Sequence, residues 1–390
     1  MDVENIQSGL RELQLPGWLL YDFHGSNPIA RHVAGLGSDR FSTRRWFGLV
    51  PQKGEPVWLH HAIEAHLFAD LPGRRVSFVS YRELQEKLRE LLKGIERVAM
   101  EYTPGGVIPY ISRVDAGTIE MVRAAGPVVV SSADLVQWSE ARWSAEGLAS
   151  HRRAAQGLKE VLQSTFAHVA REVGAGREPT EHAVQQFMGE QYRSRRLHFD
   201  PPIVAVNANA GNPHYEVRAA DSSPIRRGDL LLIDLWCREE KEGSIWADIT
   251  WMAYLGDRVP DRFRAVWDVV AGARDAAVAY LKEGVARGKR IRGADVDEVA
   301  REHVRQHGYE KQFLHRTGHS IGFEVHGNGC NIDSLETIDE RQLIPFTGFS
   351  IEPGIYLPEF GIRSEIDVYL DERSVEVTTA VQDQIVPLLT

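Results

Sequence analysis

The chain has very few cysteines and no long hydrophobic run. Its 390 residues contain two cysteines, Cys237 and Cys330, which excludes a disulfide framework. No run of 18 apolar residues occurs, and the first residues are polar without an apolar core. We therefore predict neither a membrane span nor a signal peptide, and we expect a cytoplasmic protein that does not act on membranes.

An excess of positive charge is also absent. The chain carries 45 basic and 55 acidic residues, a formal net charge of −10. This balance argues against nucleic acid as a partner. Hydrophobic residues make up 43% of the chain, enough for a sizeable core, and the length favours two domains.

Two common catalytic motifs are missing as well. The sequence has no HExxH run, which excludes a thermolysin-like zinc helix, and no GxxxxGK[ST] run, which excludes a P-loop. The chemistry must therefore come from another arrangement of residues.

That arrangement consists of four acids and one imidazole: Asp234, Asp248, His319, Glu352 and Glu365. Each lies in an apolar, strand-like or glycine-flanked segment, where an ionised group is costly unless it has a partner. Nearby basic residues are too few to pair all four acids, whereas two divalent cations would balance them. A hydroxide that bridges two such ions could act as a nucleophile.

The four acids lie on two predicted β-hairpins. Residues 230–237 and 245–251 are apolar runs around the polar loop 238–243, a pattern typical of a hairpin. Residues 349–356 and 361–368 repeat this pattern. Two hairpins with two acids each indicate a duplicated unit whose halves face one another, although the loop leaves open whether positions 234 and 248 share a face.

The remaining elements predict an α/β domain followed by an α+β domain. In the first domain we expect a small mixed sheet, with strands at 17–23, 46–50, 57–60, 76–80, 97–101 and 127–131 and helices at 82–92 and 118–125. Further on we expect helices at 144–173, from Thr180, at 266–286, and up to His307 with Asp295 as its N-cap. The predicted domains are residues 1–140 and 141–390, and each half of the second contains a helix pair and a hairpin.

Several short segments carry a resemblance to a known family. In chain order they are NPHYE, LLIDLW, ADIT, HRTGHSIG, EVHG, SIEPGIY and GIRSEIDVYL. They resemble the pita-bread metallopeptidases: Xaa-Pro dipeptidase (prolidase), Xaa-Pro aminopeptidase, methionine aminopeptidase and creatinase. The resemblance covers about residues 150–385, and the first 140 residues are similar, more loosely, to the amino-terminal domain of the prolidase and creatinase branch. Methionine aminopeptidases lack that domain, and creatinase does not keep the metal ligands that are all present here.

The resemblance implies a role for each of the five residues. Asp234 would hold one metal ion with both oxygens, and Asp248 and Glu365 would bridge two ions. His319 and Glu352 would complete the other ion, and Glu352 would also handle the proton of the bridging water. The oxygen-rich ligand set favours Mn²⁺, with Zn²⁺ or Co²⁺ as alternatives.

The resemblance also implies roles for residues around the metals. His214 would contact the substrate near the scissile bond, and His326 would bind the substrate carbonyl or transfer a proton. Arg363 and Tyr356 match family positions near the metals. A structural counter-ion and a packed aromatic remain their alternative roles, and His315 is at most a supporting residue.

The implied activity is hydrolysis of Xaa-Pro bonds in short peptides by a homodimeric exopeptidase, with a dipeptidase (prolidase) preferred. A dipeptidase needs a clamp for the substrate carboxylate, from Arg363, from Arg40, Arg44 or Arg45, or from a partner subunit. Three alternatives stay open: an Xaa-Pro aminopeptidase on longer peptides, a hydrolase of a small non-peptide amide, and a binding protein that has lost catalysis.

The chain departs from the family pattern at three places. The loop between Asp234 and Asp248 is longer, Ser320 stands where glycine is commoner, and Ile366 stands where proline-specific members often have an acid. None of these departures removes a metal ligand, so they bear on the substrate pocket.

Overall fold

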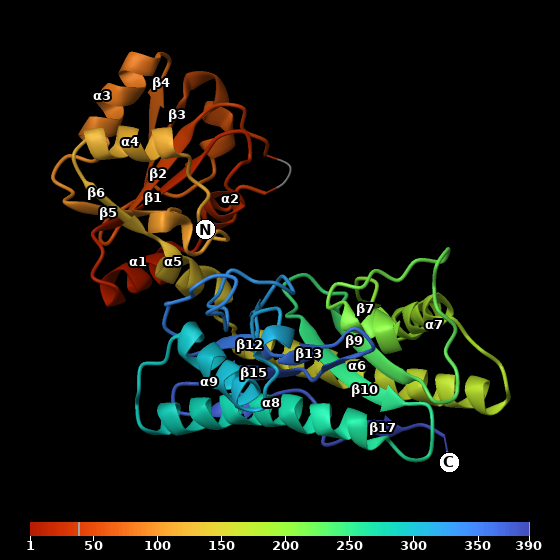
Figure 1. Ribbon diagram of the computed structural model, residues 1–390. Helices are drawn as coiled ribbons and strands as arrows, with labels where there is room; N and C mark the ends of the chain where they lie inside the picture. Colours follow the sequence, from red (N-terminus) through yellow and green to blue (C-terminus); the bar gives the residue numbers. More distant parts are fainter. Residues whose placement is uncertain (38–39, 390) are drawn as a thin grey trace. The chain divides into compact units, whose positions relative to one another are not determined.

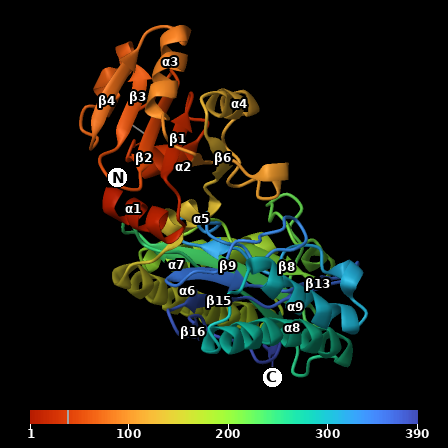
Figure 2. The same cartoon turned by 90° about the vertical axis from the view of Figure 1, so that its left-hand side faces the viewer.

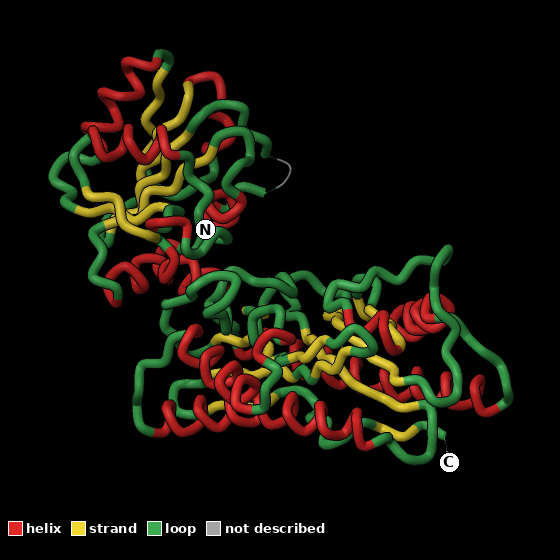
Figure 3. Tube along the Cα trace, in the orientation of Figure 1, coloured by secondary structure: helices red, strands yellow, loops and turns green. Residues whose placement is uncertain are grey.

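The computed structural model describes residues 1–37 and 40–389, and the chain divides into two compact units, Met1–Glu140 and Ala141–Thr390. In each unit helices flank the strands (Figure 3). None of the helices in the described part of the chain has the length and apolar composition needed to cross a membrane.

The first unit contains a six-stranded sheet with the strand order β4-β3-β2-β1-β5-β6 (Figure 1). Its strands are β1 Gly17–Asp22, β2 Trp46–Pro51, β3 Val57–His61, β4 Arg74–Phe78, β5 Arg97–Met100 and β6 Val128–Ser131. Strand β2 pairs antiparallel with β1 and β3, and the other neighbours pair parallel, so the sheet is mixed, as predicted. The strand predicted at 76–80 ends at Phe78 instead, because Ser80 is the N-cap of the next helix.

Helices cover both faces of this sheet. They are α1 Val3–Glu12, α2 Pro28–Ala34, α3 Tyr81–Leu91, α4 Ala116–Ala124 and α5 Ala133–Val136. Trp18 and Leu20 of β1 pack in one hydrophobic cluster with residues of α1 and α2. Leu19 and Tyr21 pack in another with residues of α3 and α4. Because successive side chains of a strand point to opposite faces, the central strand β1 is buried on both sides.

The second unit has two pairs of helices. They are α6 Ala145–Gly174 with α7 Glu181–Ser194, and α8 Asp261–Ala286 with α9 Gly293–Gln306, and α8 and α9 lie side by side (Figure 2). Helices α6 and α7 begin at the N-caps Ser144 and Thr180, whose hydroxyl oxygens accept backbone N–H bonds.

Helix α9 corrects one prediction. Its N-cap is Arg292, and Asp295 lies at the third helical position, where its carboxylate accepts the backbone N–H of Arg292. The acid therefore supports the N-cap residue from inside the first turn, a position that also suits its charge.

The strands of the second unit form the predicted hairpins. The first is β9 Leu230–Glu239 with β10 Ala247–Tyr254, joined at its edges by β7 Leu197–His198, β8 Ile203–Val206 and β17 Val386–Pro387. The second half contains β11 Ser320–Ile321, β12 Thr347–Ile351, β13 Gly354–Tyr356, β14 Gly361–Arg363, β15 Ile366–Leu370 and β16 Val375–Val377.

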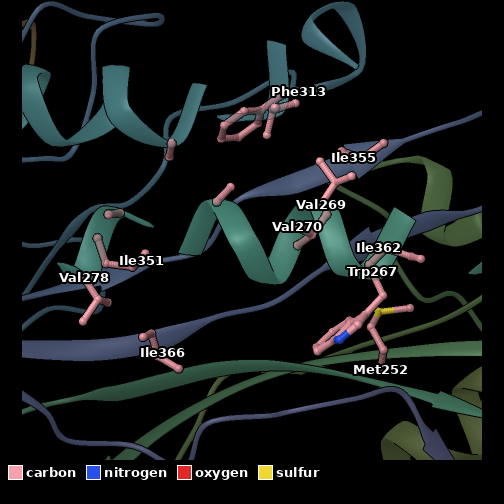
Figure 4. Packing of buried hydrophobic residues seen from close by; sticks show 14 of the residues in the cluster. Met252, Trp267, Val269, Val270, Val278, Phe313, Ile351, Ile355, Ile362 and Ile366 are labelled. Atoms are coloured by element: carbon pink, nitrogen blue, oxygen red, sulfur yellow. The ribbon is translucent and has the colours of Figure 1, made fainter. Parts of the chain in front are cut away.

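Each hairpin packs against its own helix pair. Leu231, Ile233 and Cys237 of β9 pack in one cluster with residues of α6 and α7, and Cys237 behaves there as a small apolar side chain. Leu230 and Leu232 pack in a second cluster with residues of α8, α9 and the other hairpin. Figure 4 shows part of this second cluster, in which Met252, Ile351, Ile362 and Ile366 surround side chains of α8. The predicted duplication, a helix pair and a hairpin in each half, is confirmed.

Candidate metal centre

The first hairpin brings Asp234 and Asp248 to the same face. Thr250 lies directly opposite Asp234 in the β9–β10 register, and Asp248 lies opposite Trp236. Residues directly opposite one another share a face, and so do residues two apart in one strand. Asp234, Thr250 and Asp248 therefore form one polar row on a hairpin that is otherwise apolar, which resolves the facing that the sequence left open.

The second hairpin is interrupted where its acids lie, which corrects the single returning strand predicted at 361–368. One ladder ends at the pair Ile351 and Ile366, and the next begins at the pair Gly354 and Arg363. Proline at position 353 has no N–H to continue a ladder.

At this interruption, backbone hydrogen bonds to other segments hold the two glutamates in place. The backbone N–H of Glu352 donates to the Thr317 carbonyl over 2.7 Å, and that of Glu365 donates to the Thr250 carbonyl over 3.3 Å. Both glutamates are thereby tied to segments outside their own hairpin, and one of these segments belongs to the other half of the unit.

His319 directly precedes the short strand β11, which pairs with β12. Its neighbour Gly318 is essential for this approach, because a Cβ atom there would lie 1.9 Å from the Ser350 carbonyl oxygen. The His319 Nε2 atom lies 3.7 Å from Asp248 Oδ2 and 3.5 Å from Glu352 Oε1. Ligand atoms of Asp248, His319 and Glu365 all lie within 4.8 Å of one another.

Burial and mutual repulsion dominate the electrostatics of this cluster. Burial, and then the neighbouring Asp234, raise the pKa of Asp248 well above its usual range. Burial and then Asp248 do the same to the pKa of Glu365, and burial raises the pKa of Glu352 to about 7. Burial lowers the pKa of His319 well below its usual value, so the imidazole is neutral. The protein alone thus opposes the charged carboxylates, and bound cations would reverse that effect.

Two carboxylate oxygens of the cluster lack a partner. Asp248 Oδ1 and Glu365 Oε1 are buried and have no hydrogen-bond donor among the residues that the structure describes. Buried polar atoms nearly always have one, so these two oxygens need an explanation. Carboxylate oxygens next to a neutral imidazole are the donors that divalent cations such as Mn²⁺ and Zn²⁺ accept, and the residues present therefore fit a metal centre.

Arg363 joins Asp234 to its surroundings. Its Nη2 donates to Asp234 Oδ2, its Nε donates to Thr250 Oγ1 over 3.0 Å, and its Nη1 donates to the Tyr356 hydroxyl over 3.0 Å. The buried guanidinium is engaged on all three nitrogens. This geometry favours the counter-ion role for Arg363 over the carboxylate clamp that the sequence left open.

The Tyr356 hydroxyl makes hydrogen bonds to His315 and Arg363. His315 Nδ1 lies 2.7 Å from the Arg316 carbonyl, and its Nε2 lies 2.7 Å from the Tyr356 hydroxyl. Burial and then Arg363 lower the pKa of His315 to about 3, so His315 is neutral and its one proton bonds the carbonyl. Tyr356 therefore donates to His315 and accepts from Arg363, and it is more than a packed aromatic.

His214 and His326 lie at the solvent side of the cluster, and both residues are partly open to solvent. The His326 ring meets the His319 ring edge-on, with centroids 4.4 Å apart. Burial of the His326 ring lowers its pKa, and the neighbouring Arg316 and His214 lower it further, to about 4. His214 also lines a pocket of about 400 Å³ together with Ile203, which pairs with Asp234 in the sheet.

Three residues near the cluster were not predicted as part of it. The Thr250 and Ser350 hydroxyls donate to Glu365 and Glu352, and the Asp248 backbone N–H donates to Asp367 Oδ2 over 2.8 Å. Thr250 and Ser350 lie two residues from Asp248 and Glu352. Thr250 and Ser350 are polar residues at alternating positions of two apolar strands, and this pattern is the sequence signal that could have identified them.

Comparison with known proteins places the chain in a family. Residues 149–372 match the model of Peptidase_M24, metallopeptidase family M24. The chain belongs to this metallopeptidase family. It is 27% identical over 228 residues to an Xaa-Pro dipeptidase of Pyrococcus furiosus, across 58% of this chain and 60% of the relative. The match thus spans about 60% of that relative's length.

Two solved structures share the fold over nearly the whole chain. A dipeptidase from Pyrococcus horikoshii has a TM-score of 0.63 at 22% identity, covering 99% of this chain and 100% of the other. The dipeptidase PepE from Mycobacterium ulcerans has a TM-score of 0.70 at 20% identity, covering 100% and 97%. These likenesses confirm the predicted pita-bread fold of this M24 member.

Proposed function

We propose that this M24 protein is a dinuclear metal-dependent exopeptidase that hydrolyses the Xaa-Pro bond of dipeptides. The observation that carries the proposal is the buried cluster in which Asp248 and Glu365 each keep one oxygen without a partner among the described residues, beside the neutral His319. Family membership and the similarity to an Xaa-Pro dipeptidase support the same conclusion.

The five residues divide between two ions in this proposal. Asp234 would hold one ion, His319 and Glu352 would hold the other, and Asp248 and Glu365 would contribute to both. Two bound cations would lower the pKa of a shared water and stabilise the oxyanion that forms at the substrate carbonyl. The ligands favour Mn²⁺ and are compatible with Zn²⁺ or Co²⁺.

The protein's own groups move the protons. Glu352 Oε1 lies 3.5 Å from His319 Nε2, so a carboxylate that can take up a proton lies within the cluster. It accepts the proton of the attacking water and passes it to the leaving nitrogen. His326, neutral and beside His319, donates one hydrogen bond to the substrate carbonyl, and His214 contacts the substrate on the side of Asp234.

Substrate length requires a further cation. A dipeptide presents its carboxylate close to the scissile bond, and Arg363 is already engaged with Asp234, Thr250 and Tyr356. The clamp in this proposal is another arginine of this chain or one of a partner subunit in a homodimer. We also propose a cytoplasmic location, where short peptides are recycled.

The proposal is tested by removing metal with a chelator, restoring Mn²⁺, and comparing an Xaa-Pro dipeptide with an Xaa-Pro-containing tripeptide. Cleavage of the dipeptide alone supports the dipeptidase, and cleavage of the tripeptide changes the assignment to an Xaa-Pro aminopeptidase. Two bound metals without cleavage of either indicate a small non-peptide amide as substrate. No metal and no cleavage would leave a binding protein on the same fold.

A further inference from the structure

Thr250 lies at the centre of the proposed metal centre, on β10 opposite Asp234, and its side chain is fully buried. The hydroxyl has one proton and two lone pairs. It accepts a bond from Arg363 Nε over 3.0 Å, and it lies 2.8 Å from Glu365 Oε2. Because an arginine only donates, the hydroxyl keeps its proton for a neighbouring carboxylate: it donates to Glu365, and Asp234 is a second acceptor beside it.

The same residue also holds the backbone of Glu365, whose N–H donates to the Thr250 carbonyl. Glu365 lies between two ladders and has no ladder bond of its own at that point. Thr250 therefore fixes Glu365 at two atoms, and it leaves Oε1 as the oxygen without a partner.

Ser350 repeats this arrangement in the other half of the unit. Its fully buried hydroxyl accepts the backbone N–H of His319 over 3.0 Å. A backbone N–H only donates, so the hydroxyl proton points to Glu352 Oε1, 3.2 Å away. Each half thus contains a buried hydroxyl that accepts a hydrogen bond from a group that can only donate. The same hydroxyl donates a hydrogen bond to a glutamate.

We infer that Thr250 and Ser350 are positioning residues that orient Glu365 and Glu352 for metal binding, with Thr250 the stronger of the two. The inference rests on the proposed function, because it assigns these glutamates to the metal ions. The shorter bond from Thr250 and its second bond to the Glu365 backbone account for the difference in strength.

The test is titration of chelator-treated protein with Mn²⁺, which gives the dissociation constant and the number of ions bound. Thr250→Val removes the hydroxyl at nearly constant volume and is expected to weaken binding by about 10- to 100-fold, the usual cost of losing a residue that supports a ligand. Ser350→Ala is expected to weaken it less. Thr250→Ser keeps the proton and should restore the wild-type affinity.

The matched control is Thr165→Val, because Thr165 is an equally buried threonine whose hydroxyl bonds the Val161 carbonyl within α6. Thermal unfolding of each metal-free variant shows whether it is folded. Should Thr250→Val fail to fold, the smaller Thr250→Ala is compared with Thr250→Ser.

The inference is overturned if wild type binds two ions and Thr250→Val binds them equally well, or if Thr165→Val weakens binding as much. It is also overturned if Thr250→Ser is as weak as Thr250→Val. A wild-type protein that binds no metal would instead contradict the proposed function.

Discussion

Both units of this protein bury carboxylates, but the hydrogen bonds to these carboxylates differ between the first unit and the second. In the first unit Glu101 is fully buried, and burial raises its pKa to about 7. Its Oε1 accepts from Trp18 Nε1 over 2.6 Å and from Ser132 Oγ over 3.1 Å, and its Oε2 accepts from Asn27 Nδ2 over 2.7 Å. Every oxygen has a donor from the protein.

In the second unit Asp248 and Glu365 are also buried, yet each keeps one oxygen without a donor in the described part of the chain. Their neighbours are further acids, and the pKa of each is raised by those acids as well as by burial. Glu101 is thus supplied with donors by the protein, whereas Asp248 and Glu365 keep lone pairs that a cation could use.

The largest effect is expected from Asp248→Asn. The amide keeps the size of the side chain but loses the charge, so Mn²⁺ affinity and dipeptide hydrolysis should fall by at least about 100-fold. Without metal the same variant should be more stable than wild type at about pH 8, because it no longer buries an acid among acids. Metal titration and thermal unfolding in chelator measure the two effects.

The matched control is Glu101→Gln in the first unit, which should leave metal binding unchanged. Normal metal binding and turnover in Asp248→Asn would show that the two buried carboxylate sites do not differ in the way proposed.

His326→Ala should reduce turnover by about 100-fold while two ions still bind, as expected for loss of a residue that bonds or protonates the substrate. The side chain contacts the His319 ring by its edge and is not assigned to a metal. Steady-state kinetics with metal analysis separates the two readouts. His307→Ala on the exposed end of α9 is the control, and an equal loss there would remove His326 from the site.

Arg363→Lys should weaken Mn²⁺ binding by about tenfold. A lysine ammonium keeps the charge beside Asp234 but cannot reproduce the planar fork that also reaches Thr250 and Tyr356. Titration with Mn²⁺ measures the loss. If metal binding is normal and only the KM for the dipeptide rises, Arg363 is the carboxylate clamp instead.

The last effect concerns the pH dependence of the first unit and leaves the metal centre untouched. The folded-state pKa of Glu101, about 7, lies above its ordinary value of 4.5, so between these values the folded chain keeps a proton that the unfolded chain releases. Stability is therefore highest below about pH 4.5 and falls, by up to about 3 kcal/mol, as pH rises towards 7.

Hydrogen exchange of peptides from β1 and β5, at several pH values, measures this decline in the wild-type chain. Glu101→Gln cannot titrate and should lose this part of the pH dependence. An unchanged pH profile in the variant would assign the decline to other groups.

Much of the fold could be predicted because it depends on local patterns. The apolar runs around 238–243 predicted the first hairpin, and the periodicity of residues 144–173 predicted α6 to within one residue. The interruption at Glu365 was not predicted, because it depends on a bond to Thr250 from a distant segment. Asp295 was predicted as the N-cap of α9 but lies at the third helical position. An acid in the first turn of a helix resembles an N-cap in sequence.

The site was predicted less completely than the fold. Carboxylates in apolar strands are visible in the sequence, so all five residues of the cluster could be named. Hydrogen-bond direction is not visible there, and the roles of Thr250 and Ser350 follow only once Arg363 and the His319 N–H are located as their donors. The two oxygens without partners are likewise a property of the folded chain.

The central claim is that the unfilled oxygens of the second unit hold two divalent cations. Its most direct test is metal analysis of the chelator-treated wild-type chain after re-equilibration with Mn²⁺ and removal of free ion. The account predicts two ions per chain, lost in Asp248→Asn and kept in Glu101→Gln. Binding of no ion by the wild type, or of two ions by Asp248→Asn, would contradict it.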